Sequence, residues 1–509
     1  MDNYTISFNG HQAQIKPQLV TSIANQLYDE LSYAPTGVEF SPNHISNRWI
    51  YRNGKRVYNA RANWDGKVRL FKQLKRPTDI QMFPSGLLLK ALHHLGSIKD
   101  QVVLNDLVPV TQPAPRTLDG LTLPLKGKLA KLVFGAHQHA VVTALLDAPF
   151  GRGMAESPTG SGKTLMTAEI CYKFPKHTVL ITVPSKSLLY QTSSDLSDLL
   201  GEEVGLYGDG LATFKRVTVA IINSLQEGAK KPHITTYLKS VQIWIVDESH
   251  LSAADSYRYV SAFLPNTQRR IGLSATLHRE DGAELEFHGL IGPKVVTIPP
   301  MDLVDSNWLA RPIIEMHIIE HNNGERGFKK PPFDAVYKSQ VVNNTIRNDA
   351  IFMHATRCQT EGLLPCMILV KDIKHGEILH ELISNLGPTA YLYGDDSQQV
   401  RQDVIEQLQA GKIQFLVASS IFDVGIDIPE LRAIILAGAG KSASRAIQRV
   451  GRGLRRAPSK TTALIIDFED REANFLHGHS MERRGWYEAY YPGCVTTWRD
   501  RTQLKDVPW

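Results

Sequence analysis

The sequence predicts an α/β protein with two tandem lobes, each built on a doubly wound parallel sheet, and a small α+β domain ahead of them. Three observations support this fold class. Near-continuous β-branched and apolar runs alternate with helical patterns in two successive regions, 126–300 and 301–509, as is typical of strands buried on both faces of a parallel sheet. Residues 1–125 instead show short alternating strands and one helical pattern. A chain of 509 residues also exceeds what one hydrophobic core can organise.

The composition is that of a globular protein with a modest positive charge. Of its residues 42% are hydrophobic and 21% charged, and the net charge of +6 is compatible with a polyanionic partner without requiring one. The four cysteines lie far apart with no C-x-x-C spacing, which disfavours a disulfide framework and a structural zinc motif and favours a reducing compartment; they are Cys171, Cys358, Cys366 and Cys494. No apolar run reaches the ~18 residues that a membrane span needs, and the first residues lack a signal-peptide pattern. We therefore expect a cytoplasmic protein without a membrane partner.

The predicted first domain contains a basic segment interleaved with aromatic residues. Between positions 48 and 76 a single acid, Asp65, stands among ten cations: Arg48, Arg52, Lys55, Arg56, Arg61, Lys67, Arg69, Lys72, Lys75 and Arg76. Cations neutralise phosphates and flat rings stack on bases. We therefore predict nucleic-acid contacts by four residues of this segment: Arg61, Trp64, Lys67 and Arg69. The alternatives are a solvated basic hairpin around Asn53-Gly54 with its aromatic residues in a small core, and a locally hydrogen-bonded turn at Trp64-Asp65-Gly66.

A phosphate-binding loop is predicted in the second region, after a Pro-containing stretch at 108–125 that is typical of a linker. The loop reads Ser157-Pro158-Thr159-Gly160-Ser161-Gly162-Lys163-Thr164 and opens into a helical pattern. Its glycines let backbone N–H groups approach a polyphosphate, Lys163 reaches the β- and γ-phosphates, and the Thr164 hydroxyl can ligate Mg²⁺. The alternative is a Gly-Ser turn before an ordinary helix, since Ser157 stands where the strict pattern has Gly.

Four buried strands are predicted to follow the loop, at 178–183, 217–222, 241–246 and 270–273. The third strand ends in Asp247-Glu248-Ser249-His250. Ligands bind parallel sheets at the carboxyl ends of the strands, so we expect these acids to serve the same site as the loop. Asp247 would hold Mg²⁺, and Glu248 would orient or deprotonate the water that attacks the γ-phosphate.

The third region repeats this strand pattern, at 366–370, 390–393, 414–418 and 433–437, and has no phosphate loop of its own. In the helix predicted for Gln448 to Arg455, Arg452 and Arg455 are three residues apart and share one face. Guanidinium groups suit the charge that spreads over a phosphoryl group during its transfer. These two side chains are therefore candidate arginine fingers, delivered across a cleft between the lobes. The alternative is a solvated basic helix.

Together these segments resemble the motif set of superfamily 2 helicases and translocases, in the same order, over residues 130–480. The matching segments are 157–164 (motif I), 182–185 (Ia), 247–250 (II, in its DExH form), 274–276 (III), 416–429 (V) and 448–455 (VI). The resemblance implies two RecA-like lobes and an ATP hydrolase that is stimulated by nucleic acid, with ATP and Mg²⁺ as cofactors.

The resemblance also assigns roles to individual residues. It implies that Mg-ATP is handled by Lys163, Thr164, Asp247 and Glu248, with Thr164 and Asp247 as the metal ligands. It implies that the site is completed from the second lobe by Gly425, Asp427, Gln448, Arg452 and Arg455. Ser185 and Ser419 would contact the backbone of the tracked strand. Gln138 stands at the position of an adenine-reading glutamine, although Gly135-Ala136-His137 lacks the Arg-Pro-aromatic neighbours often found before it.

Shorter segments are similar to particular branches of this superfamily. Residues 275–282, and 475–480 with Arg483, resemble the XPB-like branch, whereas 63–70 and 83–87 resemble the amino-terminal domain of phage UvsW-type helicases. This likeness implies an ATP-dependent DNA helicase or translocase, acting in recombination, repair and replication. It would remodel forks and Holliday junctions by branch migration and move 3′ to 5′. We expect a monomer that binds branched or forked DNA largely without regard to sequence, in the host cytoplasm if a phage encodes it.

Three other functions remain open on the sequence alone. The motor motifs do not separate DNA from RNA, so a DExH-type RNA helicase is one alternative. An ATP-gated nucleic-acid clamp or scaffold without processive unwinding is another, which the intact Glu248 and the paired Arg452 and Arg455 disfavour. A motor subunit of a restriction system is the third, although the chain shows no nuclease signature.

Overall fold

The structure is a computed structural model, and the structural statements below concern the residues that it describes. These are 4–36, 41, 49–52, 55–58, 64–74, 80–125, 128–249, 255–277, 282–320, 332–394, 396–419, 428, 430–440, 447, 450, 451, 453–455, 457, 460–471 and 474–498. The chain forms two compact units. Unit 1 comprises Met1–Ser157 with Gly162–Thr297, and unit 2 comprises Pro158–Ser161 with Ile298–Trp509. Among the described helices, none is both long enough and apolar enough to cross a bilayer.

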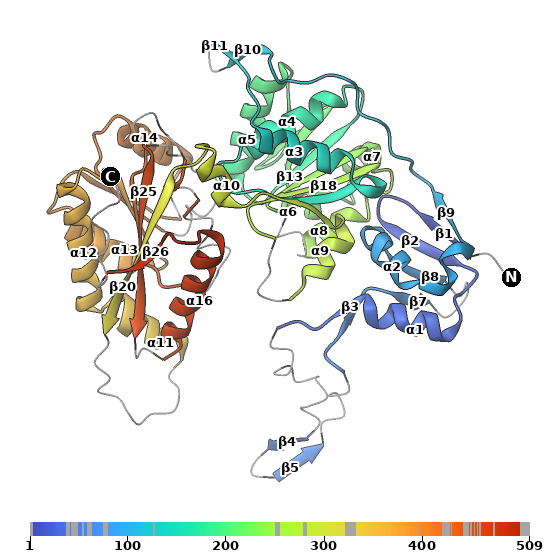
Figure 1. Ribbon diagram of the computed structural model, residues 1–509, viewed down its shortest axis with the longest axis horizontal. Coiled ribbons are helices and arrows are strands. Elements are labelled where there is room, and N and C mark those ends of the chain that lie inside the picture. Colours follow the sequence, from blue (N-terminus) through green and yellow to red (C-terminus); the bar gives the residue numbers. More distant parts are fainter. Residues whose placement is uncertain are drawn as a thin grey trace. The chain divides into compact units, whose positions relative to one another are not determined.

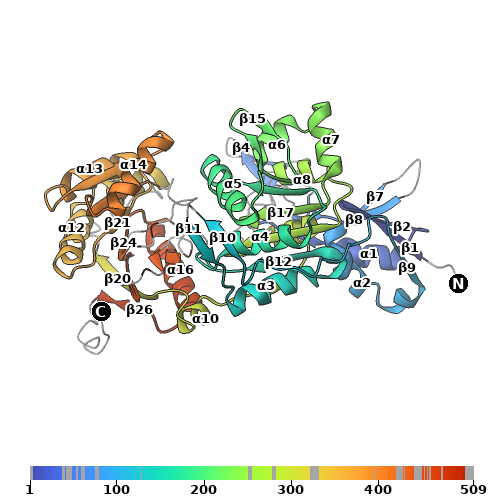
Figure 2. The same cartoon turned by 90° about the horizontal axis from the view of Figure 1, so that it is seen from above.

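Unit 1 begins with a five-stranded sheet in the order β7-β8-β2-β1-β9. Its strands are β1 (Tyr4–Phe8), β2 (Gln12–Lys16), β7 (Lys72–Leu74), β8 (Ile80–Pro84) and β9 (Val102–Asp106). Alternate residues of β1 and β2 point into a core that they share with helices α1 (Thr21–Glu30) and α2 (Leu88–His94). The Asn9-Gly10 turn joins β1 to β2, and the Asn9 side chain accepts hydrogen bonds from the backbone N–H groups of His11 and Gln12. Figure 2 shows α1 and α2 beside this sheet.

The rest of unit 1 is an eight-stranded sheet in the order β15-β14-β16-β13-β17-β18-β12-β19. Its strands are β12 (Arg152–Glu156), β13 (Val179–Val183), β14 (Gly205–Gly208), β15 (Leu211–Thr213), β16 (Val217–Ile221), β17 (Ile243–Asp247), β18 (Arg269–Ser274) and β19 (Lys294–Thr297). Every pairing is parallel except that of β14 with β15. The strands predicted from the sequence are β13, β16, β17 and β18, each within about two residues of the expected bounds. Strands β13 and β16 are buried at every position, which explains their unbroken apolar runs.

Helices cover both faces of this sheet. They are α3 (Ala136–Leu146), α4 (Lys163–Lys173), α5 (Lys186–Leu200), α6 (Ile222–Gly228), α7 (Pro232–Ser240), α8 (Asp255–Ser261) and α9 (Glu284–Leu290). Helices α6 to α9 share one core with side chains of β12, β13 and β17. Helix α4 packs against α3 and α5. A hairpin of β10 (Thr122–Leu125) and β11 (Lys128–Lys131) lies against α5.

The amino-terminal sheet is joined to this larger sheet by backbone contacts. The Gly10 N–H donates to the Pro265 carbonyl at 3.0 Å, and one guanidinium nitrogen of the buried Arg152 donates to the carbonyls of Asn9 and Gly10. The segment predicted to be a linker also packs onto this lobe. Within it, the Leu118 side chain is buried, and its N–H donates to Glu169 at 2.7 Å.

Unit 2 contains a seven-stranded parallel sheet in the order β22-β23-β21-β24-β25-β20-β26. The strands are β20 (Arg311–Glu320), β21 (Cys366–Leu369), β22 (Thr389–Leu392), β23 (Phe415–Ala418), β24 (Ala433–Leu436), β25 (Thr462–Arg471) and β26 (Val495–Thr497). Successive residues of β24 enter different cores: Ile434 and Leu436 join one cluster, and Ile435 joins the other. This confirms that the strand is buried on both faces, as its sequence predicts.

Four long helices enclose the sheet of unit 2 (Figure 1). Helices α12 (Thr345–Thr360) and α13 (Ile373–Ile383) contribute to one core. Helices α14 (Gln398–Gln409) and α16 (Asn474–Tyr490) lie against the other core. The unit also contains α10 (Pro300–Asp305), α11 (Phe333–Tyr337) and a π-helical turn at Lys338–Val342. The predicted fold class, two α/β lobes with parallel sheets and a small α+β domain ahead of them, is confirmed.

Candidate active site

The predicted phosphate loop lies between β12 and α4. Gly160 and Gly162 both have φ of +86°, in the left-handed region that favours glycine. Gly162 caps the amino terminus of α4. The Lys163 ammonium group donates to the Ser157 carbonyl at 3.3 Å, so its charge lies close to the start of the loop. A positively charged side chain at the amino end of an 11-residue helix makes this a suitable place for an anion.

Gln138, the predicted adenine reader, is fully buried on α3. Its side-chain oxygen accepts the Gly135 N–H at 2.9 Å. Its side-chain nitrogen lies against the phosphate loop, since a Cβ atom added to Gly162 would approach it to 2.2 Å. The structure therefore places Gln138 at the loop, and its contact with a base stays a prediction.

The acid pair lies at the end of β17, which is hydrogen-bonded to β18, the neighbour of β12. Asp247 is the last residue of β17, and Glu248 has φ of +51°, an unusual conformation for a residue that is not glycine. The Glu248 N–H donates to the Asp247 carboxylate at 3.0 Å. Backbone strain of this kind is found at functional sites. Here it is directly associated with the two candidate catalytic carboxylates.

Three loops of unit 1 meet at this edge of the sheet. The Ser157 N–H of the phosphate loop donates to the Ser274 carbonyl at 2.8 Å, which ties the end of β12 to the end of β18. The Ser274 hydroxyl donates to the Thr276 carbonyl at 2.6 Å. A Cβ atom at Gly272 would lie 3.0 Å from that of Ser249, which follows the acid pair. The motif residues at 157, 249 and 274 thus converge as the parallel-strand pattern predicts.

Tyr257, on α8, is a residue near the acid pair that the sequence did not predict. Burial, and secondly the charges of Asp247 and Glu248, raise the pKa of its hydroxyl above the ordinary value. Among the described residues no group hydrogen-bonds this hydroxyl, nor those of Ser249 and Thr276. Tyr257 follows the acid pair by nine residues but is separated from it by a loop. Helical spacing therefore gave no signal for its position.

The two serines predicted to contact a nucleic-acid backbone both follow sheet strands. Ser185 lies after β13 and caps α5, where its hydroxyl accepts the Leu188 N–H at 3.4 Å. Ser419 follows β23 and is largely buried, and its N–H donates to the Leu392 carbonyl at 3.0 Å. Their contacts with nucleic acid remain predictions.

Besides Ser419, the structure describes one more site residue predicted in the 301–509 region, Arg455. It forms an isolated backbone bridge with Leu309. Gly425, Asp427, Gln448 and Arg452 lie outside the described residues. Arg483, singled out by the XPB-like segment, is buried. It donates to Asp467 on β25 at 2.7 Å and to the Gly440 carbonyl at 2.7 Å. These bonds tie α16 to the middle of β25 and to the loop after β24.

In the amino-terminal domain, Arg61 lies outside the described residues, and the other three predicted contacts are described. The Trp64 indole donates to the Lys67 carbonyl at 2.9 Å, and the Arg69 guanidinium donates to Asp65 at 2.9 Å. The Arg69 hydrogen bond holds the pKa of Asp65 below its ordinary value. Trp64 and Arg69 therefore form a locally hydrogen-bonded turn, while Lys67 is exposed.

Comparison with known proteins finds two family matches. Residues 131–279 match the family described as Type III restriction enzyme, res subunit. Residues 354–457 match the Helicase conserved C-terminal domain. The first match contains the phosphate loop and the acid pair, and the second extends through Arg455.

Two relatives and one solved structure illustrate the similarity. The "DNA 3'-5' helicase XPB" of Kineococcus radiotolerans is 26% identical over 317 residues, 60% of this chain and 54% of the relative. The "ATP-dependent DNA helicase uvsW" of Enterobacteria phage T4 is 22% identical over 333 residues, 63% of this chain and 65% of the relative. The structure "S. cerevisiae Dbp5 bound to RNA and ADP BeF3" matches with a TM-score of 0.51 at 18% identity, covering 73% of this chain and 92% of that one. The chain spans about half to two thirds of the length of the first curated relatives it matches.

Proposed function

Because the chain carries the two domains of a superfamily 2 helicase, we propose that it couples ATP hydrolysis to movement along DNA and remodels forked or branched DNA. One observation supports ATP hydrolysis in particular. The phosphate loop, the acid pair and the Ser274 loop converge at the carboxyl edge of one parallel sheet, where ligands of such sheets bind.

The residues of the phosphate loop and the acid pair fit ATP and Mg²⁺ by their chemistry. Two glycines in the left-handed conformation open the loop at the amino end of α4, and Lys163 supplies a positive charge for the β- and γ-phosphates. Thr164 and Asp247 supply hard oxygen ligands of the kind that Mg²⁺ prefers. When bound, Mg²⁺ neutralises charge that develops on the transferred phosphoryl group.

Glu248 is proposed as the residue that orients the attacking water and takes up its proton. Its backbone is in the left-handed region, and its N–H donates to the Asp247 carboxylate at 3.0 Å. The residues Gly425, Asp427, Gln448, Arg452 and Arg455 of the second lobe would complete the site. The arginines would stabilise negative charge in the transition state.

DNA is proposed as the partner because the relatives reported above are named as DNA helicases. Ser185 and Ser419 would contact the backbone of the strand, and the basic segment of the first domain would contact additional phosphates. Phosphate contacts carry no base information. Binding is therefore expected to be largely independent of sequence and to weaken steeply with salt.

The experiment is a comparison of ATP hydrolysis with single-stranded DNA, duplex DNA, a four-way DNA junction and single-stranded RNA, at one salt concentration. We expect the junction and single-stranded DNA to stimulate most. Stimulation by RNA alone would assign the chain to the RNA helicases. ATP hydrolysis without any unwinding or branch migration in a strand-displacement assay would favour the alternative of an ATP-gated nucleic-acid clamp.

A further inference from the structure

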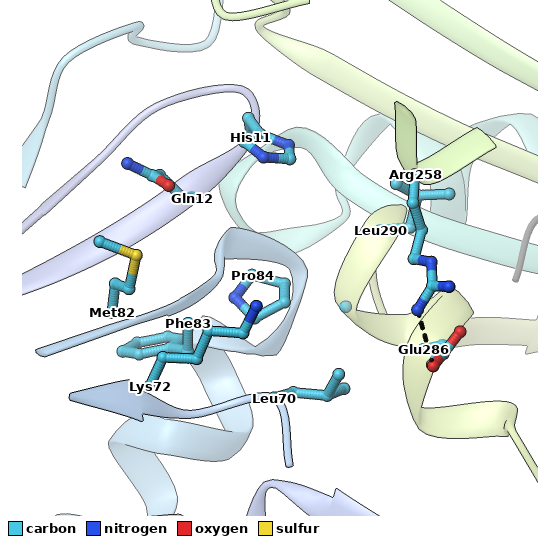
Figure 3. Close-up of a pocket in the computed structure, with 11 residues that line it drawn as sticks. His11, Gln12, Leu70, Lys72, Met82, Phe83, Pro84, Arg258, Glu286 and Leu290 are labelled. Carbon is cyan, nitrogen blue, oxygen red and sulfur yellow. Dashed lines mark hydrogen bonds and ion pairs between the residues drawn. The ribbon is translucent and has the colours of Figure 1, made fainter. Parts of the chain in front are cut away.

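A small cavity lies within unit 1, where the amino-terminal sheet meets the larger sheet's helices (Figure 3). Figure 3 shows Gln12, Lys72, Met82 and Phe83 on one side, and Arg258, Glu286 and Leu290 on the other. The first group comes from β2, β7 and β8, and the second from α8 and α9. The cavity therefore exists only because the two sheets are docked together.

The walls of the cavity are fixed by close backbone packing. A Cβ atom at Gly86 would lie 2.2 Å from the His288 carbonyl oxygen and 2.6 Å from that of Gly289, so the short helix η3 (Ser85–Leu87) rests directly on α9. On the other side, Arg270 is fully buried and donates to the Leu290 carbonyl at 3.1 Å and to the Ser261 hydroxyl at 2.5 Å. These contacts tie the ends of α8 and α9 together. A site with such walls requires little ordering when a ligand enters.

The lining has an apolar part and polar groups from both walls. Leu70, Met82, Phe83, Pro84 and Leu290 line the apolar part. His11 and Gln12 offer neutral hydrogen-bonding groups, since burial, with the charges of Arg270 and Arg152, lowers the pKa of His11 to about 4. The volume of about 220 Å³ is below the ~300–1,000 Å³ of sites for drug-sized ligands. It suits a single small ring system.

The charges around the cavity favour an anionic chain outside it. Lys72 is exposed on the edge strand β7 and has no carboxylate partner among the described residues. It belongs to the segment in which ten cations accompany one acid. The one acid of the lining, Glu286, is buried and accepts hydrogen bonds from Arg258 at 3.0 Å and from the Tyr33 hydroxyl. Its charge is therefore compensated.

We infer that this cavity binds one unpaired nucleobase of a DNA strand, with the adjacent phosphate held by Lys72. The cavity lies between strands β2, β7 and β8 and helices α8 and α9. The ring would pack against the half-buried Met82 and Pro84, which suits the polarizable thioether of methionine. His11 and Gln12 would face polar atoms at the edge of the base. This inference takes its partner from the proposed function and assigns that partner a site outside the helicase motifs.

The test measures binding by the full-length protein without ATP. A fluorescent oligothymidylate is compared with an abasic oligonucleotide of the same length, at one salt concentration. The wild-type protein is expected to prefer the base-bearing strand about tenfold, the effect of stacking one base. Met82→Trp, which fills the cavity, should remove this preference and leave abasic binding unchanged. An unchanged preference in Met82→Trp would overturn the inference.

Lys72→Ala tests the phosphate contact. This substitution should weaken the binding of both oligonucleotides. It should also reduce the salt dependence of binding by the equivalent of about one phosphate contact. Lys99→Ala, at an exposed lysine of the same domain outside the cavity, is the control and should change neither. Equal effects of the two substitutions would contradict the assignment of Lys72.

A photocrosslink covers the case in which Met82→Trp does not fold. An oligonucleotide with one 4-thiothymidine is irradiated with the wild-type protein, and crosslinked peptides are identified by mass spectrometry. Crosslinks to residues that line the cavity, in segments 11–12, 70–84 or 286–290, are expected, and crosslinks confined to segments that do not line it would overturn the inference. DNA-stimulated ATP hydrolysis is measured separately. Absence of ATP hydrolysis together with a Met82-dependent base preference would therefore refute the proposed ATP-driven function and still support the nucleobase site.

Discussion

Glu248 adopts a backbone conformation that few side chains tolerate, immediately after a strand that fixes it in place. Such strain is maintained by the surrounding structure, and here it falls on the candidate general base. Replacing Glu248 by Gln preserves its size and removes its ability to accept a proton. We expect kcat for ATP to fall by about 10²–10⁴-fold, the usual contribution of a general base, with ATP binding retained. Glu381→Gln, at an exposed glutamate of unit 2, should change neither quantity.

Lys163 is held close to the loop by its hydrogen bond to the Ser157 carbonyl. Lys163→Ala removes the one side-chain cation that the loop supplies for the phosphates. ATP hydrolysis should become undetectable in a phosphate-release assay. Lys176→Ala, at an exposed lysine after α4, should hydrolyse ATP at the wild-type rate. Normal turnover by Lys163→Ala would refute the loop assignment.

His11 links stability to pH. Its pKa is lowered to about 4 in the folded protein, from 6.5, first by burial and then by the charges of Arg270 and Arg152. The unfolded chain therefore takes up a proton that the folded chain excludes as the pH falls from about 6.5 to about 4, and stability is lost over this interval. The loss attributable to His11 is about 2 kcal/mol at pH 5.

Denaturant unfolding at pH 7.5 and pH 5 measures this effect. The difference between the two pH values should be smaller in His11→Gln than in the wild type. His93→Gln, at an exposed histidine on α2, serves as the control and should behave as the wild type. Equal pH dependence in His11→Gln and the wild type would show that folding does not lower the pKa of His11.

Single residues also mark what the sequence could and could not predict. Lys163 and Asp247 were identifiable because their chemistry depends on neighbours within a few positions along the chain. The location of Tyr257 beside the acids, and of Arg270 at the junction, depends on tertiary packing of segments far apart in the sequence. No local spacing encodes such contacts.

Among the elements, α4 begins at a position that glycine alone accommodates without strain. Gly162 combines a φ of +86° with close contact to Gln138. Gly162→Ala should therefore destabilise the protein by the strain of about 1–2 kcal/mol for a left-handed residue plus the cost of displacing Gln138. Gly201→Ala, at the end of α5 with φ of +64° and no neighbouring atom, should show the strain alone. Thermal unfolding of the two variants would reveal the difference, and equal losses would exclude the Gln138 contribution.

The strands of both sheets were the most predictable elements, because burial on both faces leaves continuous apolar runs. Their order in the sheet was not predictable, since crossovers bring together strands distant in sequence, such as β12 and β18. The segment 108–125 has a composition typical of a linker. In the structure, contacts such as that of Leu118 with Glu169 hold it on the larger sheet.

At the scale of the molecule, the predicted likeness to superfamily 2 helicases is confirmed by the two family matches, which lie in order along the chain. The role in remodelling branched DNA is a proposal. Removing the amino-terminal domain tests it, and the structure shows where the deletion should end. A deletion of residues 1–106 keeps Leu118 and its contact with Glu169, whereas a deletion of residues 1–125 removes both.

The shorter deletion should retain basal ATP hydrolysis and lose preference for forked over plain duplex DNA, measured as the ratio of stimulated rates. The longer deletion should in addition unfold at a lower temperature. An unchanged fork preference in the shorter deletion would place fork recognition in the two lobes. Equal unfolding temperatures would show that the 108–125 segment contributes nothing to stability.

The junction between the two sheets of unit 1 has a consequence for protein engineering. The carbonyls of Asn9 and Gly10 cap Arg152, and Gly10 itself has no room for a side chain beside Leu264 and Thr267. A chimaera that grafts this amino-terminal domain onto another motor must therefore also carry Arg152 and the turn around Leu264 and Thr267. Otherwise the carbonyls of Asn9 and Gly10 would lose the guanidinium group that donates to them.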